Sequence, residues 1–104
     1  MSQIRAGLEL ARLDEIANPG ALVVAAEGVS LILTRCDGAV SAFVNRCAHA
    51  DYRLERADGR LIVQEGRFLV CAAHGASYAL QDGACAGGPC NGRGLERLKI
   101  MVRD

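Results

Sequence analysis

The chain has 104 residues, with 12 basic and 12 acidic side chains and no formal net charge. This length suits one domain with a modest core, and the absence of a basic run argues against nucleic-acid binding. No segment approaches the roughly 18 apolar residues of a membrane span, and no apolar signal segment opens the chain, so we expect a soluble cytoplasmic protein.

Short apolar runs separated by glycine turns dominate the sequence. Residues 8–16 are compatible with one or two helical turns, and the "DG" at 37–38 between two apolar runs predicts a hairpin over 32–43. The expected strands are, in chain order, 21–26, 29–35, 39–44, 61–64, 67–71, 76–81 and 97–102. Regularly spaced short strands predict an all-β fold, an antiparallel sandwich or barrel.

Two Cys/His pairs are prominent because the chain holds only two histidines. Cys47 and His49 lie in "CAHA", and Cys71 and His74 lie in "CAAH", each pair at the end of an expected strand. If the two loops converge, the thiols and imidazoles form one site, and such soft ligands favour zinc or iron–sulfur over magnesium or calcium. The alternative, that all four are ordinary surface or core residues, fits poorly with both histidines being paired with a cysteine.

The order of ligands within each pair favours an iron–sulfur cluster over zinc. Structural zinc sites usually group like ligands, as C-x(2–4)-C and H-x(3–5)-H. Here each loop holds one cysteine and one histidine. A [2Fe–2S] cluster with two cysteines on one iron and two histidines on the other takes one ligand for each iron from each loop.

The two motifs, C-x-H and C-x-x-H, and the residues around them resemble Rieske [2Fe–2S] proteins. The stretch "AVSAFVNRCAHADYRL" (39–54) is similar to the strand and first cluster loop of Rieske ferredoxins. The stretch "LVCAAHGASYALQDG" (69–83) is similar to their second loop and return strand, and "AGGPC" (86–90) to the segment that covers the cluster.

The resemblance implies a fold and a set of site residues. The fold is a Rieske-like antiparallel β-sandwich, a single domain over residues 1–104 with a cluster-binding part of two hairpin loops at about 45–92. The cofactor is a Rieske-type [2Fe–2S] cluster. Its implied ligands are Cys47, His49, Cys71 and His74, supported by Gly75, Tyr78 and Pro89.

The sequence departs from the family pattern at positions other than the ligands. His49 and Cys71 are separated by 21 residues, more than is usual in the family, which indicates an enlarged hairpin. Tyr52 and Ala73 stand where membrane-anchored respiratory members have disulfide-forming cysteines, so the resemblance is to the soluble ferredoxin type. Ala76 replaces a serine that donates to a bridging sulfide in those members, and this loss predicts a low reduction potential.

Three cysteines lie outside the two motifs. Cys85 and Cys90 flank the Gly-Gly-Pro turn, where a local disulfide is one interpretation. In a cytoplasmic protein we expect them instead to be two reduced, half-buried thiols. Cys36 is expected to serve packing or to lie at the surface.

The resemblance implies one-electron transfer by a carrier that is not a complete enzyme. An oxygenase would also need a mononuclear iron held by a 2-His-1-carboxylate triad, and both histidines are already used. We expect a ferredoxin between a reductase and a terminal oxygenase, monomeric in isolation, with no nucleic-acid or membrane partner. The alternatives are a small Rieske subunit of a larger redox assembly, such as a nitrite-reductase-type complex, and a zinc-stabilised interaction module.

Overall fold

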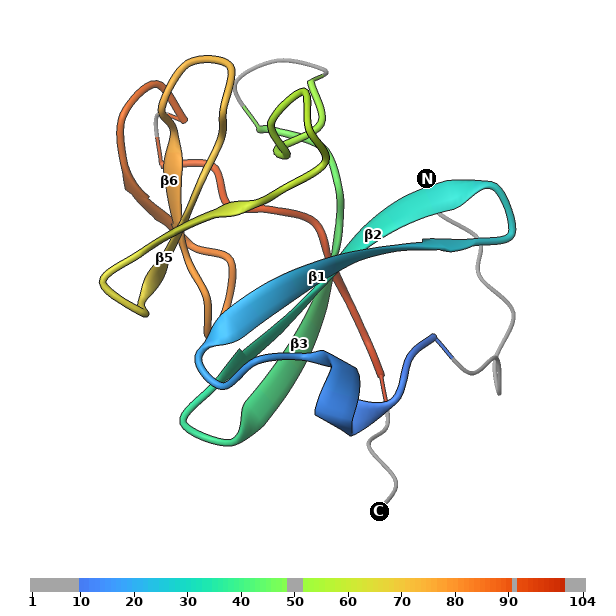
Figure 1. The fold of residues 1–104 in the computed structure, drawn as a ribbon. Coiled ribbons are helices and arrows are strands. Elements are labelled where there is room, and N and C mark those ends of the chain that lie inside the picture. Colours follow the sequence, from blue (N-terminus) through green and yellow to red (C-terminus); the bar gives the residue numbers. More distant parts are fainter. Residues whose placement is uncertain (1–9, 49–51, 91, 101–104) are drawn as a thin grey trace.

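Two antiparallel sheets of four strands each form the structure, a computed structural model that describes residues 10–48, 52–90 and 92–100 (Figure 1). A 3-10 helix, η1, precedes the first strand. Sheet A has the order β1-β2-β3-β8, and sheet B has the order β4-β5-β6-β7. The elements are Leu13–Glu15 (η1), Gly20–Ala26 (β1), Val29–Cys36 (β2), Ala39–Val44 (β3), Ile62–Gln64 (β4), Phe68–Val70 (β5), Ser77–Ala79 (β6), Cys85–Gly87 (β7) and Arg97–Leu98 (β8).

The all-β antiparallel fold predicted from the sequence is confirmed, with differences in individual elements. The expected helical turn within 8–16 is the single turn η1. The last expected strand, 97–102, is only Arg97–Leu98, and residues 101–102 lie outside the described residues. Strand β7 was not predicted from the sequence, because the "CAG" of Cys85–Gly87 has no apolar alternation. Its strand conformation depends on pairing with β6 in the folded protein.

The β2–β3 hairpin shows how turn chemistry sets the register. Asp37 and Gly38 both have positive φ, 52° and 80°, as the two central residues of a tight type I′ hairpin turn require. The turn pairs Cys36 with Ala39 and places Ile32 opposite Phe43. The predicted hairpin over 32–43 is therefore confirmed.

The core lies between the two sheets and reaches the base of the loops. From sheet A, the fully buried Ile32 and Phe43 face inward. From sheet B and its connections come Leu69, Tyr78 and Leu80, each at most 1% exposed. Alternate residues of β2 and β3, such as Leu33 and Ala42, face the other side, where they pack with Ile16 of the N-terminal segment. Sheet A is thus covered on both faces.

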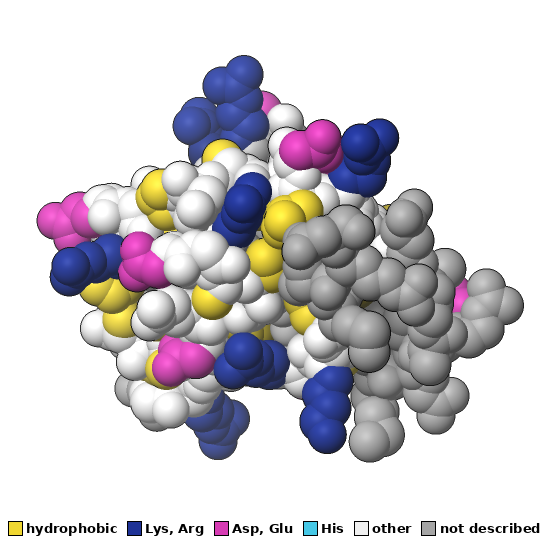
Figure 2. Space-filling view, turned by 90° about the horizontal axis from the view of Figure 1, so that it is seen from below, with side chains coloured by type: hydrophobic (Ala, Val, Ile, Leu, Met, Phe, Trp, Pro, Cys, Tyr) yellow, Lys and Arg dark blue, Asp and Glu magenta, His cyan; other side chains and the backbone are white. Residues whose placement is uncertain are grey.

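The loops that follow β3, β5 and β7 emerge at one end of the molecule, at the top of Figure 1. The opposite end is seen in Figure 2, where basic and acidic side chains of the described residues are interspersed and hydrophobic ones lie among them in small groups. None of the helices in the described ranges is long and apolar enough to cross a membrane. The loops that carry the predicted ligands Cys47, Cys71 and His74 therefore lie together at one end of a two-layer scaffold.

Candidate metal centre

The first loop leaves sheet A at the end of β3 and carries Cys47. The Cys47 N–H donates to the Tyr52 carbonyl at 2.8 Å, which holds together the two ends of the loop. The Cys47 side chain is only 3% exposed and belongs to the same core cluster as Cys71. His49 lies outside the described residues, so its predicted place as a ligand stays a prediction.

The second loop follows β5 and is a tight turn from Cys71 to Ala76. The Cys71 N–H donates to the Ala76 carbonyl at 2.8 Å, and the Gly75 N–H donates back to the Cys71 carbonyl at 2.9 Å. Gly75 has a φ of +79°, which glycine adopts without steric cost. The turn buries Cys71 and leaves His74 exposed, so the thiol and the imidazole of this loop lie at different depths.

The structure brings the two thiols together at the base of these loops. The Cys71 side chain lies within hydrogen-bonding reach of Cys47, and the Tyr78 Oη lies 3.2 Å from the Cys47 Sγ. The same Oη accepts the Ala48 N–H at 3.0 Å. A phenol oxygen that accepts from one neighbour keeps its own proton for another, so Tyr78 is placed to donate to the Cys47 sulfur.

The environment of the sulfurs is apolar but well supplied with donors. Burial raises the pKa of the Cys71 thiol, the N–H groups of Ala73 and His74 lower it, and the neighbouring Cys47 raises it again. Burial also raises the pKa of the Tyr78 phenol, as does its hydrogen bond with Cys47. Because a bound metal removes thiol protons, these N–H groups and the Tyr78 hydroxyl would then donate to thiolate sulfur.

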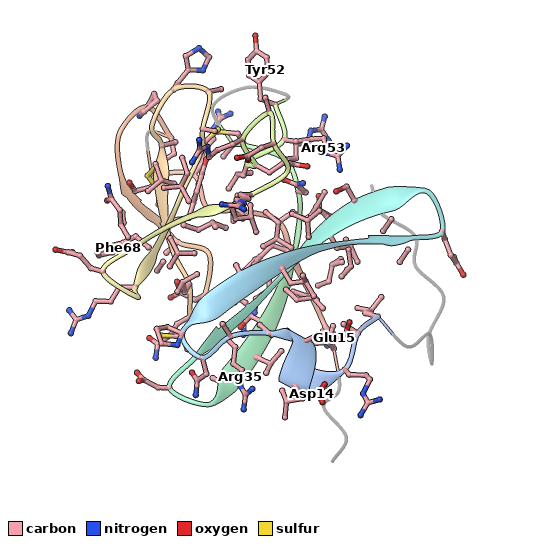
Figure 3. All side chains as sticks on the ribbon, in the orientation of Figure 1. Asp14, Glu15, Arg35, Tyr52, Arg53 and Phe68 are labelled. Carbon is pink, nitrogen blue, oxygen red and sulfur yellow. A yellow bond between two sulfur atoms is a disulfide. The ribbon has the colours of Figure 1, made fainter. Side chains whose placement is uncertain are left out.

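The exposed side of the site holds two rings. The Tyr52 and His74 ring centroids are 5.5 Å apart with the planes inclined by 64°, an edge-to-face contact. The Tyr52 side chain points away from the body of the protein at the loop end (Figure 3). It is the one large hydrophobic side chain among the described residues that is well exposed, at 53%.

The described donors are compatible with a binuclear cluster. Within the described ranges, no three His, Cys, Asp or Glu side chains gather closely enough to hold one metal ion. A Rieske-type cluster needs only two ligands on each iron, cysteines on one and histidines on the other. The buried pair Cys47 and Cys71 suits the first iron, and the exposed His74 lies where it could serve the second.

The cover segment, residues 86–90, lies directly on the second loop. It begins in β7, which pairs with β6 so that Gly87 lies opposite Ser77. A Cβ on Gly88 would lie 2.8 Å from the Gly75 carbonyl oxygen, so the two backbones are in contact. Pro89 is half-buried within this segment. Gly75 therefore lies in the second loop, Tyr78 lies against the Cys47 sulfur, and Pro89 belongs to the segment packed on the second loop.

The expectation that Cys85 and Cys90 are separate reduced thiols is wrong. The structure joins them in a disulfide with a Cα–Cα distance of 6.1 Å. The turn after β7 brings the buried Cys90 back beside Cys85, a proximity that five residues of spacing alone do not reveal. Cys36, Cys47 and Cys71 take part in no disulfide.

One residue at the site was missed in the sequence analysis. Asn45 lies two residues before Cys47 and is only 4% exposed. Its side-chain carbonyl accepts the Leu54 N–H at 2.8 Å. A polar residue directly after a strand, two residues before a ligand cysteine, was the available signal.

Comparison with known proteins agrees with this architecture. The ferredoxin of Sphingomonas yanoikuyae B1 superimposes with a TM-score of 0.73 at 26% identity, over 93% of this chain and 90% of that one. The ferredoxin of carbazole 1,9a-dioxygenase from Nocardioides aromaticivorans IC177 gives 0.72 at 22% identity, over 92% and 88%. The terminal oxygenase of that dioxygenase from the same organism gives 0.70 at 23% identity, where this chain covers 26% of the larger one. Comparison with curated protein sequences gives no match.

The family model of the Rieske [2Fe-2S] domain matches residues 8–101. The chain therefore belongs to the Rieske [2Fe–2S] family, and its cofactor is a Rieske-type [2Fe–2S] cluster. The resemblance inferred from the two Cys/His motifs is confirmed.

Proposed function

We propose that this protein is a one-electron carrier, the ferredoxin component between a reductase and a terminal oxygenase. Cys47 and Cys71 hold one iron of the cluster, and His49 and His74 hold the other. The whole of residues 1–104 is one Rieske domain, with its cluster-binding part at about 45–92. The observation that carries the proposal is the pair of buried thiols, one of them in contact with the Tyr78 hydroxyl, with the exposed His74 in the loop that carries Cys71.

The bound cluster supplies reversible uptake of one electron at iron. The residues of this chain set where that electron can enter and leave. The Cys47 side lies in the core, whereas His74 is exposed and contacts Tyr52. Electron exchange with a partner therefore takes place at the loop end, through the imidazole and Tyr52.

The hydrogen-bond donors around the cysteine sulfurs set the stability of the added electron. Hydrogen bonds to cluster sulfurs stabilise the reduced state. The Tyr78 hydroxyl and the N–H groups of Ala73 and His74 point toward the cysteine sulfurs, whereas Ala76 supplies no hydroxyl. We expect a potential toward the low end of the roughly −150 to +300 mV Rieske range.

The partners are redox proteins. The relatives with similar folds include a ferredoxin of a dioxygenase and an oxygenase solved in complex with a ferredoxin. With both histidines of the chain committed to the cluster, no 2-His-1-carboxylate iron site remains, so this protein carries electrons for an oxygenase and does not perform the oxygenation. We propose a cytoplasmic monomer with no nucleic-acid or membrane partner.

Anaerobic purification with counts of iron and acid-labile sulfide tests the cluster, and Cys36 offers a matched control. We expect about two irons and two sulfides per chain with a Rieske-type EPR signal on reduction. The Cys47→Ser and His74→Ala variants should lose the signal, whereas Cys36→Ser should keep it because Cys36 lies at the far end of β2. A colourless wild-type protein with stoichiometric zinc, or a Cys47→Ser variant with an unchanged cluster, would refute the proposal.

Electron delivery is tested with a purified Rieske oxygenase and its reductase, by following substrate-dependent oxidation of reduced protein. If the oxygenase does not oxidise the reduced holoprotein faster than dissolved oxygen does, the oxygenase is not its partner. The protein would then still be an electron carrier.

A further inference from the structure

A group of polar side chains lies at the foot of the first loop, where it meets sheet A. The group consists of Ser30, Asn45, Arg53 and Glu55, which we call the Asn45 clasp. It joins the start of β2, the end of β3 and the return arm of the loop, segments that are far apart in sequence. Arg53 at its outer edge is labelled in Figure 3, next to Tyr52.

Asn45 is the centre of the clasp and uses its whole amide. Its Nδ2 donates to the Ser30 Oγ at 3.1 Å and to a Glu55 carboxylate oxygen at 2.8 Å. Its Oδ1 accepts the Leu54 N–H at 2.8 Å. Two donors and one acceptor are thus satisfied on a residue that is only 4% exposed.

On the outer side of the clasp, Arg53 connects Ser30 to Glu55 and completes a ring of hydrogen bonds. The Arg53 guanidinium donates to the Ser30 Oγ at 2.9 Å and lies 3.1 Å from the second oxygen of Glu55. The Glu55 side chain is only 13% exposed. Because a buried polar group left without its partner costs more than a made hydrogen bond returns, the largely buried Asn45 and Glu55 hold each other in place, and the exposed Arg53 lies at the edge of the group.

The clasp extends to the second loop through the backbone of Leu54. The Leu54 N–H is held by Asn45, and its carbonyl accepts the Ala72 N–H, next to Cys71, at 3.0 Å. The Leu54 side chain is fully buried in the core cluster that contains both thiols. No disulfide joins the two loops, because Cys47 and Cys71 form none and the Cys85–Cys90 bridge lies within and beside the cover segment. The hydrogen bonds of the Leu54 backbone to Asn45 and Ala72 are thus one noncovalent connection between the two loops.

We infer that Asn45 is a positioning residue of the cluster. By holding Leu54, it fixes the first loop against sheet A and sets its spacing from the second loop, and with it the spacing of the Cys47 and Cys71 sulfurs. This role rests on the proposed function, in which those two thiols bind iron. The Asn45 amide bonds to Ser30, Leu54 and Glu55, so it acts on the sulfurs through the loop.

The test compares variants inside and outside the clasp. Asn45→Ala removes the centre, and Glu55→Ala removes one acceptor, whereas Glu55→Gln keeps an oxygen acceptor for the Asn45 Nδ2. Thr34→Val is the matched control, because it removes a buried hydrogen bond, from the Thr34 Oγ1 to the Leu80 carbonyl at 2.6 Å, that lies away from both loops.

Two measurements separate positioning from general stability. In the holoprotein, Asn45→Ala and Glu55→Ala should shift the EPR g-values of the reduced cluster and shorten its half-life about tenfold. In the cluster-free chain, the Leu54 and Ala72 N–H groups should lose about tenfold in hydrogen-exchange protection. Glu55→Gln and Thr34→Val should leave the g-values and these two amides unchanged, even where the melting temperature falls.

Each outcome decides the inference. An Asn45→Ala protein with wild-type g-values and a Thr34→Val-like cluster half-life would overturn it. If Asn45→Ala does not fold, Glu55→Ala and Ser30→Ala carry the same test, and unchanged g-values in both would be equally fatal. A wild-type chain that binds no iron refutes the proposed function instead, and the exchange of the Leu54 and Ala72 amides in that chain still decides whether Asn45 holds the loops.

Discussion

At the scale of single residues, the chain uses its two tyrosines for opposite purposes. Tyr78 is fully buried, with its hydroxyl between the Cys47 sulfur and the Ala48 N–H. Tyr52 is half exposed and contacts His74 with its ring. The first can affect the energy of an electron at the sulfurs, and the second lies on the surface through which we propose that the electron leaves.

Tyr78→Phe should lower the reduction potential of the cluster by about 60 mV, the one-electron equivalent of about 1.4 kcal/mol. The direction follows because the hydroxyl donates to sulfur and stabilises the added electron. Redox titration followed by circular dichroism or EPR measures the shift. Tyr52→Phe is the control, since it keeps the ring against His74 and should leave the potential unchanged. Equal potentials for Tyr78→Phe and wild type would show that the Tyr78 hydroxyl does not donate to the cluster.

At the scale of elements, the cover segment is held by β7, by the Cys85–Cys90 disulfide and by backbone contact with the second loop. Gly88 makes that contact with a φ of +78°, at a distance from the Gly75 carbonyl that no Cβ tolerates. A Cβ built on its neighbour Gly87 would have no other atom within 4 Å. A side chain at Gly88 would therefore push the cover segment away from the second loop, whereas a side chain at Gly87 would not.

Gly88→Ala should therefore displace the cover from the second loop, whereas Gly87→Ala should not. We expect Gly88→Ala to shorten the half-life of the cluster in air about tenfold or more, from left-handed backbone strain and overpacking of about 2 kcal/mol together. Loss of the visible absorbance over time measures it. Indistinguishable decay of the two variants would mean that the cover does not protect the cluster.

The elements also show what could be predicted from the sequence. The long strands of sheet A and their turns were predictable, because apolar alternation and positive-φ residues such as Asp37 and Gly38 act locally. Strand β7 and the disulfide were not, because both depend on the chain returning to β6. The site was predictable as a set of residue types, since Cys47, Cys71 and His74 lie in short motifs. Asn45 was not, because its partners Ser30 and Glu55 are brought to it only by the fold.

At the scale of the whole molecule, the loop end depends on how sheet A and sheet B meet. Thr34 and Ser41 of sheet A donate to the carbonyls of Leu80 and Gln81, in the connection between β6 and β7. The Phe43 ring packs against Gly83 in the same connection. The thiol-bearing loops leave one sheet each, so overpacking that moves the sheets apart, unlike the near-isosteric loss of the Thr34 hydrogen bond, changes their relative position.

Gly83→Ala tests how tightly the two sheets are fitted. Its added Cβ would lie 2.5 Å from the Phe43 ring, at a backbone φ of +74°. Because Phe43 is fully buried and opposite Ile32, the ring cannot turn out to solvent without displacing its neighbours in the core. We expect a loss of about 3 kcal/mol of unfolding free energy, from left-handed strain and overpacking together. Gly38→Ala, with a φ of +80° and open space around it, isolates the strain and should cost about 1 kcal/mol.

Urea unfolding of the two cluster-free variants measures this difference directly. A larger loss for Gly83→Ala means that the sheets meet through a close contact that cannot yield, and that the loops start from a fixed base. In that case Gly83→Ala should also shorten the life of the cluster, although the substitution lies in a turn that carries no ligand. Equal losses for the two variants would mean that Phe43 moves freely, and that the hydrogen-bonded path through Leu54 must hold the loops without help from the sheet contact.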